Sequence, residues 1–430
     1  MSDLSRYPLL TSTGVDPDTG LLRKEDASAT HYEPVFLAAG TEIVWNDAAG
    51  DISLFAYSAE PDWHVFYTYS YPEEGNWTFF RKNENIEKMP RVWRCEKDMH
   101  ARFVFRNGTQ PHTLADAGTF RIRDRSMPPW IREEAERVRD RLREMYEEDP
   151  FVCVLLGDSH CGAGSNWPYT VESIRSTMQG LRADRLIHLG DLTDGSMPLN
   201  VTRRIASGML SDMKELGIPF GMCVGNHDLN AFRGNSPSFT PTEAAECYLG
   251  REEGWYLEDL PQKNLRIFYL DSFDPGRRQR YGFCASQLRW FKKKLRETPD
   301  GRDVLIFSHV PPAPEIHVWS DRILNGKRML RLADRMNRKK RIRIRGWFHG
   351  HSHADQIWEK YSFPVVCTGC SKTESFYTHK PLASDTPFRS WNERTQELWD
   401  VVVMDADEIR MIRYGAGWDR TIRKEEWDRK

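Results

Sequence analysis

The chain has 430 residues, of which 39% are hydrophobic and 29% charged, and its formal net charge is −2 at pH 7. This composition is typical of a globular protein with two or three domains, and the near-neutral charge gives no global field that would point to a nucleic acid or a membrane. No apolar run approaches the ~18 residues of a membrane span, and residues 1–10 lack the basic start and apolar stretch of a secretory signal. We therefore expect a soluble protein of the cytoplasm that does not enter a membrane.

The N-terminal part of the chain predicts a β domain. Residues 1–34 are polar and carry turn signals, so we treat them as a separate segment. Within 35–125, alternating runs rich in aromatic and β-branched residues recur at 41–45, 52–57, 65–71, 77–81 and 102–106. This pattern predicts a small all-β sandwich or jelly roll.

Three stretches of this β domain resemble the small β-sandwiches attached to phage and bacterial surface proteins. They are the Ala39-Gly40-Thr41 entry, the "ISLFAYSAE" run and the "ARFVFRNGT" run. The resemblance implies that the β domain binds a glycan or another protein. Association with a phage particle or a cell surface is therefore the alternative to a cytoplasmic location.

The rest of the chain predicts a helix and then an α/β domain. Residues 126–149 begin with a proline break and continue with helical spacing of apolar residues, which indicates a linker helix. From 150 to 415, strands and helices alternate as in an α/β fold, and 416–430 remain as a C-terminal tail. The predicted strands are 151–156, 185–189, 219–224, 265–270, 303–308, 344–348 and 363–367, with a late hairpin of 398–404 and 408–414. The predicted helices are 169–181, 199–216, 241–249, 285–297 and 325–339.

Five motifs of acidic, amide and imidazole side chains follow apolar strands of this domain. Open α/β sheets place their sites at such strand ends. Each motif taken singly is more often structural than metal-binding, but five together would bury many charges that only a cation could neutralise. The motifs are Asp158-Ser159-His160, Gly190-Asp191-Leu192-Thr193-Asp194, Gly225-Asn226-His227-Asp228, His309 and Gly350-His351-Ser352-His353.

The order D-x-H, G-D-x-x-D, G-N-H-D, H, G-H-x-H resembles the calcineurin-like metallophosphoesterase family over about residues 151–415. The resemblance implies a two-sheet β-sandwich flanked by helices, within the α/β (α+β) class. It implies that Asp158, His160 and His353 hold one metal ion, that Asn226, His309 and His351 hold a second, and that Asp191 bridges both. It also assigns catalytic roles to His227, Asp191 and Asp228, with His227 facing the substrate phosphate and with Asp228 and Asp194 orienting their neighbours.

The ligand types fit this chemistry. Oxygen and imidazole donors without thiolate suit two ions of Mn, Fe, Zn or Ni. Two ions ~3.5–4 Å apart lower the pKa of a bridging water towards ~7. We therefore expect hydrolysis of a phosphodiester or phosphomonoester by a metal-bridging hydroxide, with His227 assisting. A small, nucleotide-type phosphoester is the first guess for the substrate. The alternatives are a phage- or surface-associated binding module with a vestigial phosphoesterase domain, and a nuclease of the same family.

Two further features bear on the substrate. Loops choose substrates in such sites, so we hypothesise that Trp167 or Trp319 stacks on a base or sugar and that Arg233 contacts phosphate; loop packing is the alternative. Residues 338–345 carry six basic side chains in eight, a run that could hold a polyanion. The alternative for this run is a solvated helix end followed by a strand with Ile342 and Ile344 facing inward. Nucleic acid therefore stays open as a partner.

Overall fold

The computed structural model divides into two compact units, and each is described by itself. One comprises 1–127, 162–164 and 196–208, and the other comprises 128–161, 165–195 and 209–430. Among the described residues, no helix combines the length and the apolar character needed to cross a bilayer. The structure describes residues 4, 7–16, 22–32, 34–37, 41–61, 77–79, 91–95, 99–108, 112–121, 128–146, 149–161, 166–197, 199–273, 281–316, 322–339, 341–372, 388–390 and 393–423.

The first unit contains an all-β region, as the sequence predicts. Its larger sheet has the order β1-β2-β8-β5-β6, with β3 also paired to β8, and its smaller sheet has the order β7-β4-β9. The first sheet is built from β1 (Leu9–Val15), β2 (Leu22–His31), β3 (Val35–Leu37), β5 (Asp51–Pro61), β6 (Trp77–Phe79) and β8 (Met99–Arg106). The second is built from β4 (Glu42–Trp45), β7 (Val92–Arg94) and β9 (Gly118–Arg121), and short α2 (Leu114–Ala117) and η2 (Asp47–Ala49) accompany them.

Aromatic packing joins these two β layers. The Trp45 ring of the small sheet lies edge-on to Phe103 and Phe105 of β8, with ring centroids 4.8 and 5.5 Å apart. Residues 1–34, which we predicted as a separate polar segment, contribute β1 and β2, and β2 pairs with β8. The predicted run 65–71 lies outside the described residues.

The second unit is a two-sheet sandwich flanked by helices, which confirms the predicted fold class. One sheet has the order β12-β11-β10-β19-β20-β21 and the other β13-β14-β15-β16-β18-β17. The first sheet contains β10 (Phe151–Leu156), β11 (Arg185–His188), β12 (Phe220–Met222), β19 (Leu398–Met404), β20 (Glu408–Gly415) and β21 (Arg420–Arg423). The second contains β13 (Tyr256–Leu260), β14 (Leu265–Leu270), β15 (Asp303–Ser308), β16 (Arg343–His349), β17 (Asp355–Trp358) and β18 (Val365–Thr368).

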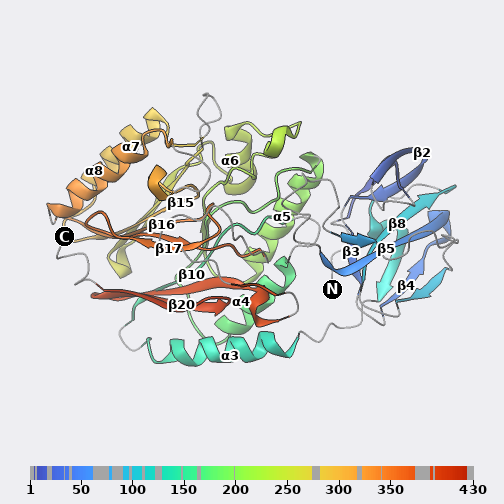
Figure 1. Cartoon of the computed structure of the whole chain (residues 1–430), viewed down its shortest axis with the longest axis horizontal. Coiled ribbons are helices and arrows are strands. Elements are labelled where there is room, and N and C mark those ends of the chain that lie inside the picture. Colours follow the sequence, from blue (N-terminus) through green and yellow to red (C-terminus); the bar gives the residue numbers. More distant parts are fainter. Residues whose placement is uncertain are drawn as a thin grey trace. The chain divides into compact units, whose positions relative to one another are not determined.

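The helices of this unit cover the outer faces of the sandwich (Figure 1). α3 and α4 lie beneath the sheet of β10 and β20, while α7 and α8 lie over the sheet of β15 and β16. The Tyr414 hydroxyl donates a hydrogen bond to the Ile131 carbonyl (2.9 Å), which ties α3 to β20. The helices are α3 (Pro129–Arg143), α4 (Trp167–Met178), α6 (Pro241–Leu249), α7 (Ala285–Arg296) and α8 (Gly326–Arg338), with short turns η4 (Phe232–Gly234), η5 (Pro261–Lys263), η6 (Pro314–Ile316) and η7 (Arg394–Gln396). A further helix, α5 (Leu199–Glu215), has its residues 199–208 in the first unit and 209–215 in the second.

The core lies between the two sheets, where Leu155 and Ile187 of one sheet pack with Phe307 and Phe348 of the other. β10, β11 and β12 run parallel, as do β14, β15, β16 and β18. Because parallel strands end at the same edge of a sheet, the loops after them converge there.

Three arginines of the basic run 338–345 pair with aspartates of the same unit. Arg343 and Arg345 both pair with Asp303, at 2.7 and 3.3 Å, and Arg345 is buried. Arg341 pairs with Asp300 at 2.7 Å. Ile342 and Ile344 are both buried, as expected if the run ends in a strand whose isoleucines face inward. These contacts favour a structural role for the run over a polyanion-binding surface.

Candidate metal centre

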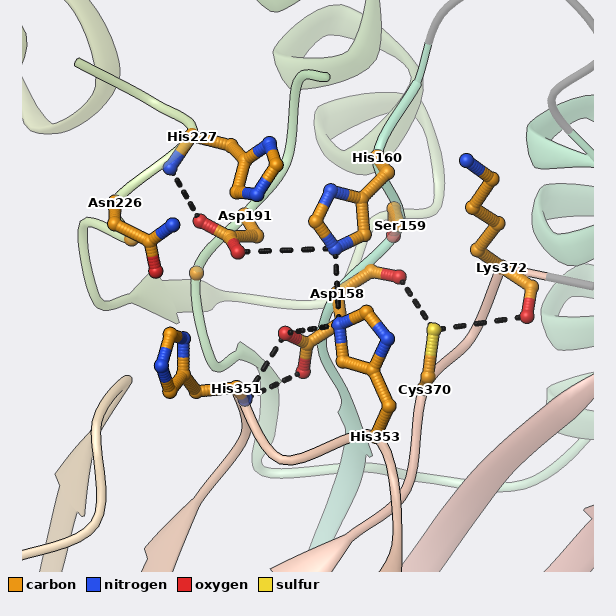
Figure 2. A network of polar contacts seen from close by, with 12 residues as sticks. Asp158, Ser159, His160, Asp191, Asn226, His227, His351, His353, Cys370 and Lys372 are labelled. Atoms are coloured by element: carbon orange, nitrogen blue, oxygen red, sulfur yellow. Dashed lines mark hydrogen bonds and ion pairs between the residues drawn. The ribbon is translucent and has the colours of Figure 1, made fainter. Parts of the chain in front are cut away.

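The five sequence motifs meet at the strand ends. Asp158 lies two residues beyond β10, Asp191 three beyond β11 and Asn226 four beyond β12. His309 follows β15 directly, and His351 lies two residues beyond β16. Each motif is thus carried on the loop that leaves a buried strand. Figure 2 shows the side chains of Asp158, Asp191, Asn226 and His351 pointing toward one another.

Asp158, His160 and His353 form one group whose potential ligand atoms all lie within 4.8 Å of one another. The Nε2 atoms of His160 and His353 are 3.1 Å apart, and His353 Nε2 is 3.3 Å from Asp158 Oδ1. Burial lowers the pKa of His160 well below its ordinary value, and the neighbouring His227 adds to this effect. His160 is therefore a neutral imidazole, which is the form that binds a metal.

Asp191, His309 and His351 form a second such group. His309 Nε2 is 3.2 Å from His351 Nδ1 and 3.1 Å from Asn226 Oδ1, which brings the predicted amide ligand to the same place. His309 Nδ1 donates to the Leu189 carbonyl at 2.9 Å. Because the carbonyl can only accept, this bond fixes the proton on Nδ1 and leaves Nε2 directed at the group.

Asp191 lies between the two groups. Its Oδ2 atom is 3.2 Å from His309 Nε2 and 3.7 Å from His160 Nε2. Burial alone would raise the pKa of Asp191, but the adjacent imidazoles, His309 first among them, hold it well below its usual value. The carboxylate is therefore ionised, and it contacts imidazoles of both groups.

The backbone is strained at these positions. Asp158, His160, Asp191, His351 and His353 all have positive φ, between 40° and 66°. The left-handed conformation is unfavourable by about 1–2 kcal/mol for a residue with a side chain, and such residues cluster at functional sites. Two glycines permit the close approach of the loops: a Cβ at Gly225 would collide with the Asp191 carboxylate, and one at Gly350 would collide with that of Asp158.

Asp228 orients the Asp191 loop. Its carboxylate accepts hydrogen bonds from the backbone N–H groups of Asp191 (2.9 Å), Leu192 (2.8 Å), Thr193 (3.1 Å) and Gly225 (2.9 Å). Burial raises its pKa to about 7, and the neighbouring charge of Asp191 adds to that rise. Because its oxygens are committed to these amides, the geometry favours the orienting role expected for Asp228 over the catalytic one.

His227 borders the first group. Its ring is edge-on to His160, with centroids 4.4 Å apart, and stacks on Phe232 at 4.2 Å. His227 Nδ1 donates to the Asp194 carbonyl oxygen, which leaves Nε2 as the reactive nitrogen. His160, Asp194 and His227 also have ligand-type atoms within 4.8 Å of one another. His227 is therefore placed beside the centre, as expected for a residue that faces a bound phosphate.

Of the three predicted substrate contacts, the described residues include only the side chain of Trp167. Trp167 is the first residue of α4 and is buried, and its Nε1 donates to Asp212 at 2.9 Å. This favours the packing alternative over stacking on a base. Trp319 and the side chain of Arg233 lie outside the described residues.

Sequence reasoning missed Lys372. It follows β18 by four residues, and its backbone N–H donates to the Asp158 carbonyl at 3.2 Å. The neighbouring Cys370 thiol donates to the same oxygen at 3.2 Å. The available signal was positional, because Lys372 comes after a strand end just as the predicted ligands do.

The donor set fits a pair of metal ions. Two separate groups of imidazole and carboxylate atoms converge, a carboxylate lies between them, and His309 Nδ1 is fixed by a backbone acceptor. Oxygen and nitrogen donors of this kind suit Mn, Fe, Zn or Ni. Cys367 and Cys370 are buried free thiols that donate to backbone carbonyls, so they belong to the packing beneath the centre.

Residues 151–355 match the model of the calcineurin-like phosphoesterase family. No curated protein matches the chain. Among solved structures, the chain is similar to a dimetal phosphatase from Danio rerio, with 16% identity, a TM-score of 0.47, and coverage of 64% of this chain and 100% of that one. It is also similar to PhoD, with 10% identity, a TM-score of 0.43, and coverage of 99% and 92%. A third match is GAP50, the anchor in the inner membrane complex of Plasmodium, with 12% identity, a TM-score of 0.43, and coverage of 64% and 88%.

Proposed function

We propose that the chain hydrolyses a small phosphoester with two bound metal ions, because residues 151–355 match the model of the calcineurin-like phosphoesterase family. The observation that carries the proposal is the position of Asp191, whose Oδ2 atom lies within 3.7 Å of an imidazole from each group. A carboxylate in that position can join two cations into one centre. When bound, such a pair supplies Lewis-acid charge for the phosphate and lowers the pKa of a water.

The side chains of the centre would bind the two ions and assist proton transfer. Asp158, His160 and His353 would hold one ion, and Asn226, His309 and His351 would hold the other. His227 has its Nδ1 proton committed to the Asp194 carbonyl, so its Nε2 atom is available to hydrogen-bond a phosphate oxygen or to protonate the leaving oxygen. Proton transfer of this kind typically contributes ~10²–10⁴-fold to the rate.

The proposal is tested by metal-dependent hydrolysis. The protein is stripped with a chelator, reloaded separately with Mn²⁺, Zn²⁺, Ni²⁺ or Fe²⁺, and assayed with p-nitrophenyl phosphate and bis-p-nitrophenyl phosphate. We expect turnover to return with at least one metal, and the ratio of the two rates to show whether monoesters or diesters are preferred.

Asp191→Asn is the matched variant for this assay, because it keeps the shape of the side chain and removes its charge. We expect it to lose turnover and to bind fewer metal ions. Full activity of Asp191→Asn, or absence of turnover with every metal in a folded protein, would refute the proposal.

A further inference from the structure

We propose that Lys372 determines substrate specificity by binding a second anionic group of the substrate, beside the phosphoester held at the metal centre. This inference rests on the proposed function and adds a substrate class to it. The substrate would be a phosphoester that carries another negatively charged group, such as a carboxylate or a further phosphate.

The first support is the attachment of the segment 370–372 to the turn that carries Asp158. The Ser371 N–H donates to the Gly157 carbonyl at 2.8 Å, and the Lys372 N–H donates to the Asp158 carbonyl at 3.2 Å. The Cys370 thiol donates to that same carbonyl at 3.2 Å. Lys372 is therefore fixed to the metal-binding turn itself, although 214 residues separate it from Asp158 in the sequence (372 minus 158).

A buried polar network holds the segment from its other side. Arg389 donates to the Cys370 carbonyl at 2.8 Å, and Asn166 donates to the Ser371 carbonyl at 2.9 Å. Asn166 also donates to the buried carboxyl of Glu397 at 2.9 Å. A segment anchored on both sides presents its side chain in a preorganised position, which reduces the ordering that binding would otherwise require.

The Lys372 side chain is 2% exposed. An ammonium in such surroundings interacts strongly with an anion because water screens the charge little.

Figure 2 shows the side chain extending alongside Ser159 and His160, on the opposite side of His160 from His227. His227 and Asp191 mark the side on which the scissile phosphate would lie between the two groups. Lys372 is therefore placed to meet a different part of the substrate, which is why we assign it to a second anion.

The test uses three ligands that are not hydrolysed. Propylphosphonate has one anionic group, while 3-phosphonopropionate and 1,3-propanediphosphonate add a carboxylate or a second phosphonate to a similar chain. Their dissociation constants are measured by calorimetry on the metal-loaded full-length protein. If Lys372 makes a charge-assisted contact, at least one of the two ligands with a second anionic group should bind about tenfold more tightly than propylphosphonate. The tighter of these two ligands shows whether the second group of the substrate is a carboxylate or a phosphate.

Lys372→Met should abolish this preference, whereas Lys372→Arg should retain part of it. Lys293→Met serves as the control because Lys293 is an exposed lysine on α7, with 71% of its side chain accessible, and it should leave the preference unchanged. The metal content of each variant is measured alongside, since a merely structural role of Lys372 would lower the affinity for all three ligands together.

The failures of this inference and of the proposed function can be told apart. If wild-type protein binds all three phosphonates equally, or if Lys372→Met keeps the preference, then Lys372 does not bind a second anionic group. In that case the metal centre still binds phosphonate and the proposed function stands. If no phosphonate binds the metal-loaded protein, the proposed function itself fails and the inference falls with it.

Discussion

The Nε2 atom of His309 lies 3.2 Å from the Oδ2 atom of Asp191. This contact joins the loop after β15 in one sheet to the loop after β11 in the other. Both side chains are buried, so their interaction is little screened by solvent. In the metal-free protein the two residues form an ion pair, and in the metal-bound protein both would be ligands.

Metal binding should therefore depend on pH. Burial alone lowers the pKa of His309, but the nearby carboxylates, Asp191 above all, raise it to about 9. Below that pH the metal-free imidazole is protonated, and a cation must displace the proton. The apparent metal affinity should therefore fall by up to about tenfold for each pH unit below 9.

Calorimetry in buffers with different ionisation enthalpies measures the protons released on metal binding. At pH 7 we expect His309→Gln to release about one proton fewer than the wild type. Equal proton release from both proteins would contradict the assignment of the displaced proton to His309.

Asp228→Asn should destabilise the fold and the centre together. The carboxylate accepts four backbone hydrogen bonds, and the amide group of asparagine would turn donors toward two of them. Leaving buried donors unsatisfied should lower the free energy of unfolding by about 2–4 kcal/mol, as measured by urea denaturation.

The control for this variant is Asp300→Asn, which breaks an exposed pair with Arg341. Exposed pairs contribute about 0–1 kcal/mol, so the control should remain near wild type. If both variants lost the same stability, the buried hydrogen bonds of Asp228 would not be the cause.

His227→Asn should slow turnover while preserving the metal content. The ring lies beside the first group and its backbone N–H, which donates to Asp191 at 2.8 Å, is unaffected by the change. We expect kcat to fall by ~10²–10⁴, with the metal content measured by elemental analysis equal to that of wild type. His112→Asn, at an exposed histidine of the β domain, should change neither quantity. Loss of a metal ion from His227→Asn would show that His227 is a ligand instead.

Arg413→Met should lower stability through the core of the second unit. The guanidinium is buried and bonds Asp400 at 2.8 Å and Asp355 at 2.9 Å. Removing the cation leaves buried carboxylates uncompensated, and the free energy of unfolding should fall by about 3–5 kcal/mol. Arg143→Met, which breaks an exposed pair with Asp140, should change it by less than about 1 kcal/mol. A loss below that limit for Arg413→Met would contradict this account.

The amino-acid sequence by itself determined the main strands of the second unit and the candidate ligands. β10, β14, β15 and β19 begin and end where the apolar runs do, because a strand buried on both faces reads as a continuous hydrophobic stretch bounded by polar residues. Asp158 and His309 come within two residues of the ends of β10 and β15, so their positions could be read from the same runs. β13, β17 and β21 were missed because short, partly polar strands carry no such pattern.

Only the tertiary structure decided which residues meet across long separations. Arg341, Arg343 and Arg345 of the basic run pair with Asp300 and Asp303, which precede them by about forty residues. No local pattern reveals that pairing. Trp167 is buried and its Nε1 donates a hydrogen bond to Asp212, so its indole ring is not available to stack on a substrate. Lys372 reaches the metal centre through hydrogen bonds between backbone groups and the Asp158 turn. Backbone groups are the same in every residue, so contacts of this kind leave no trace in the sequence and depend on the fold that brings the two segments together.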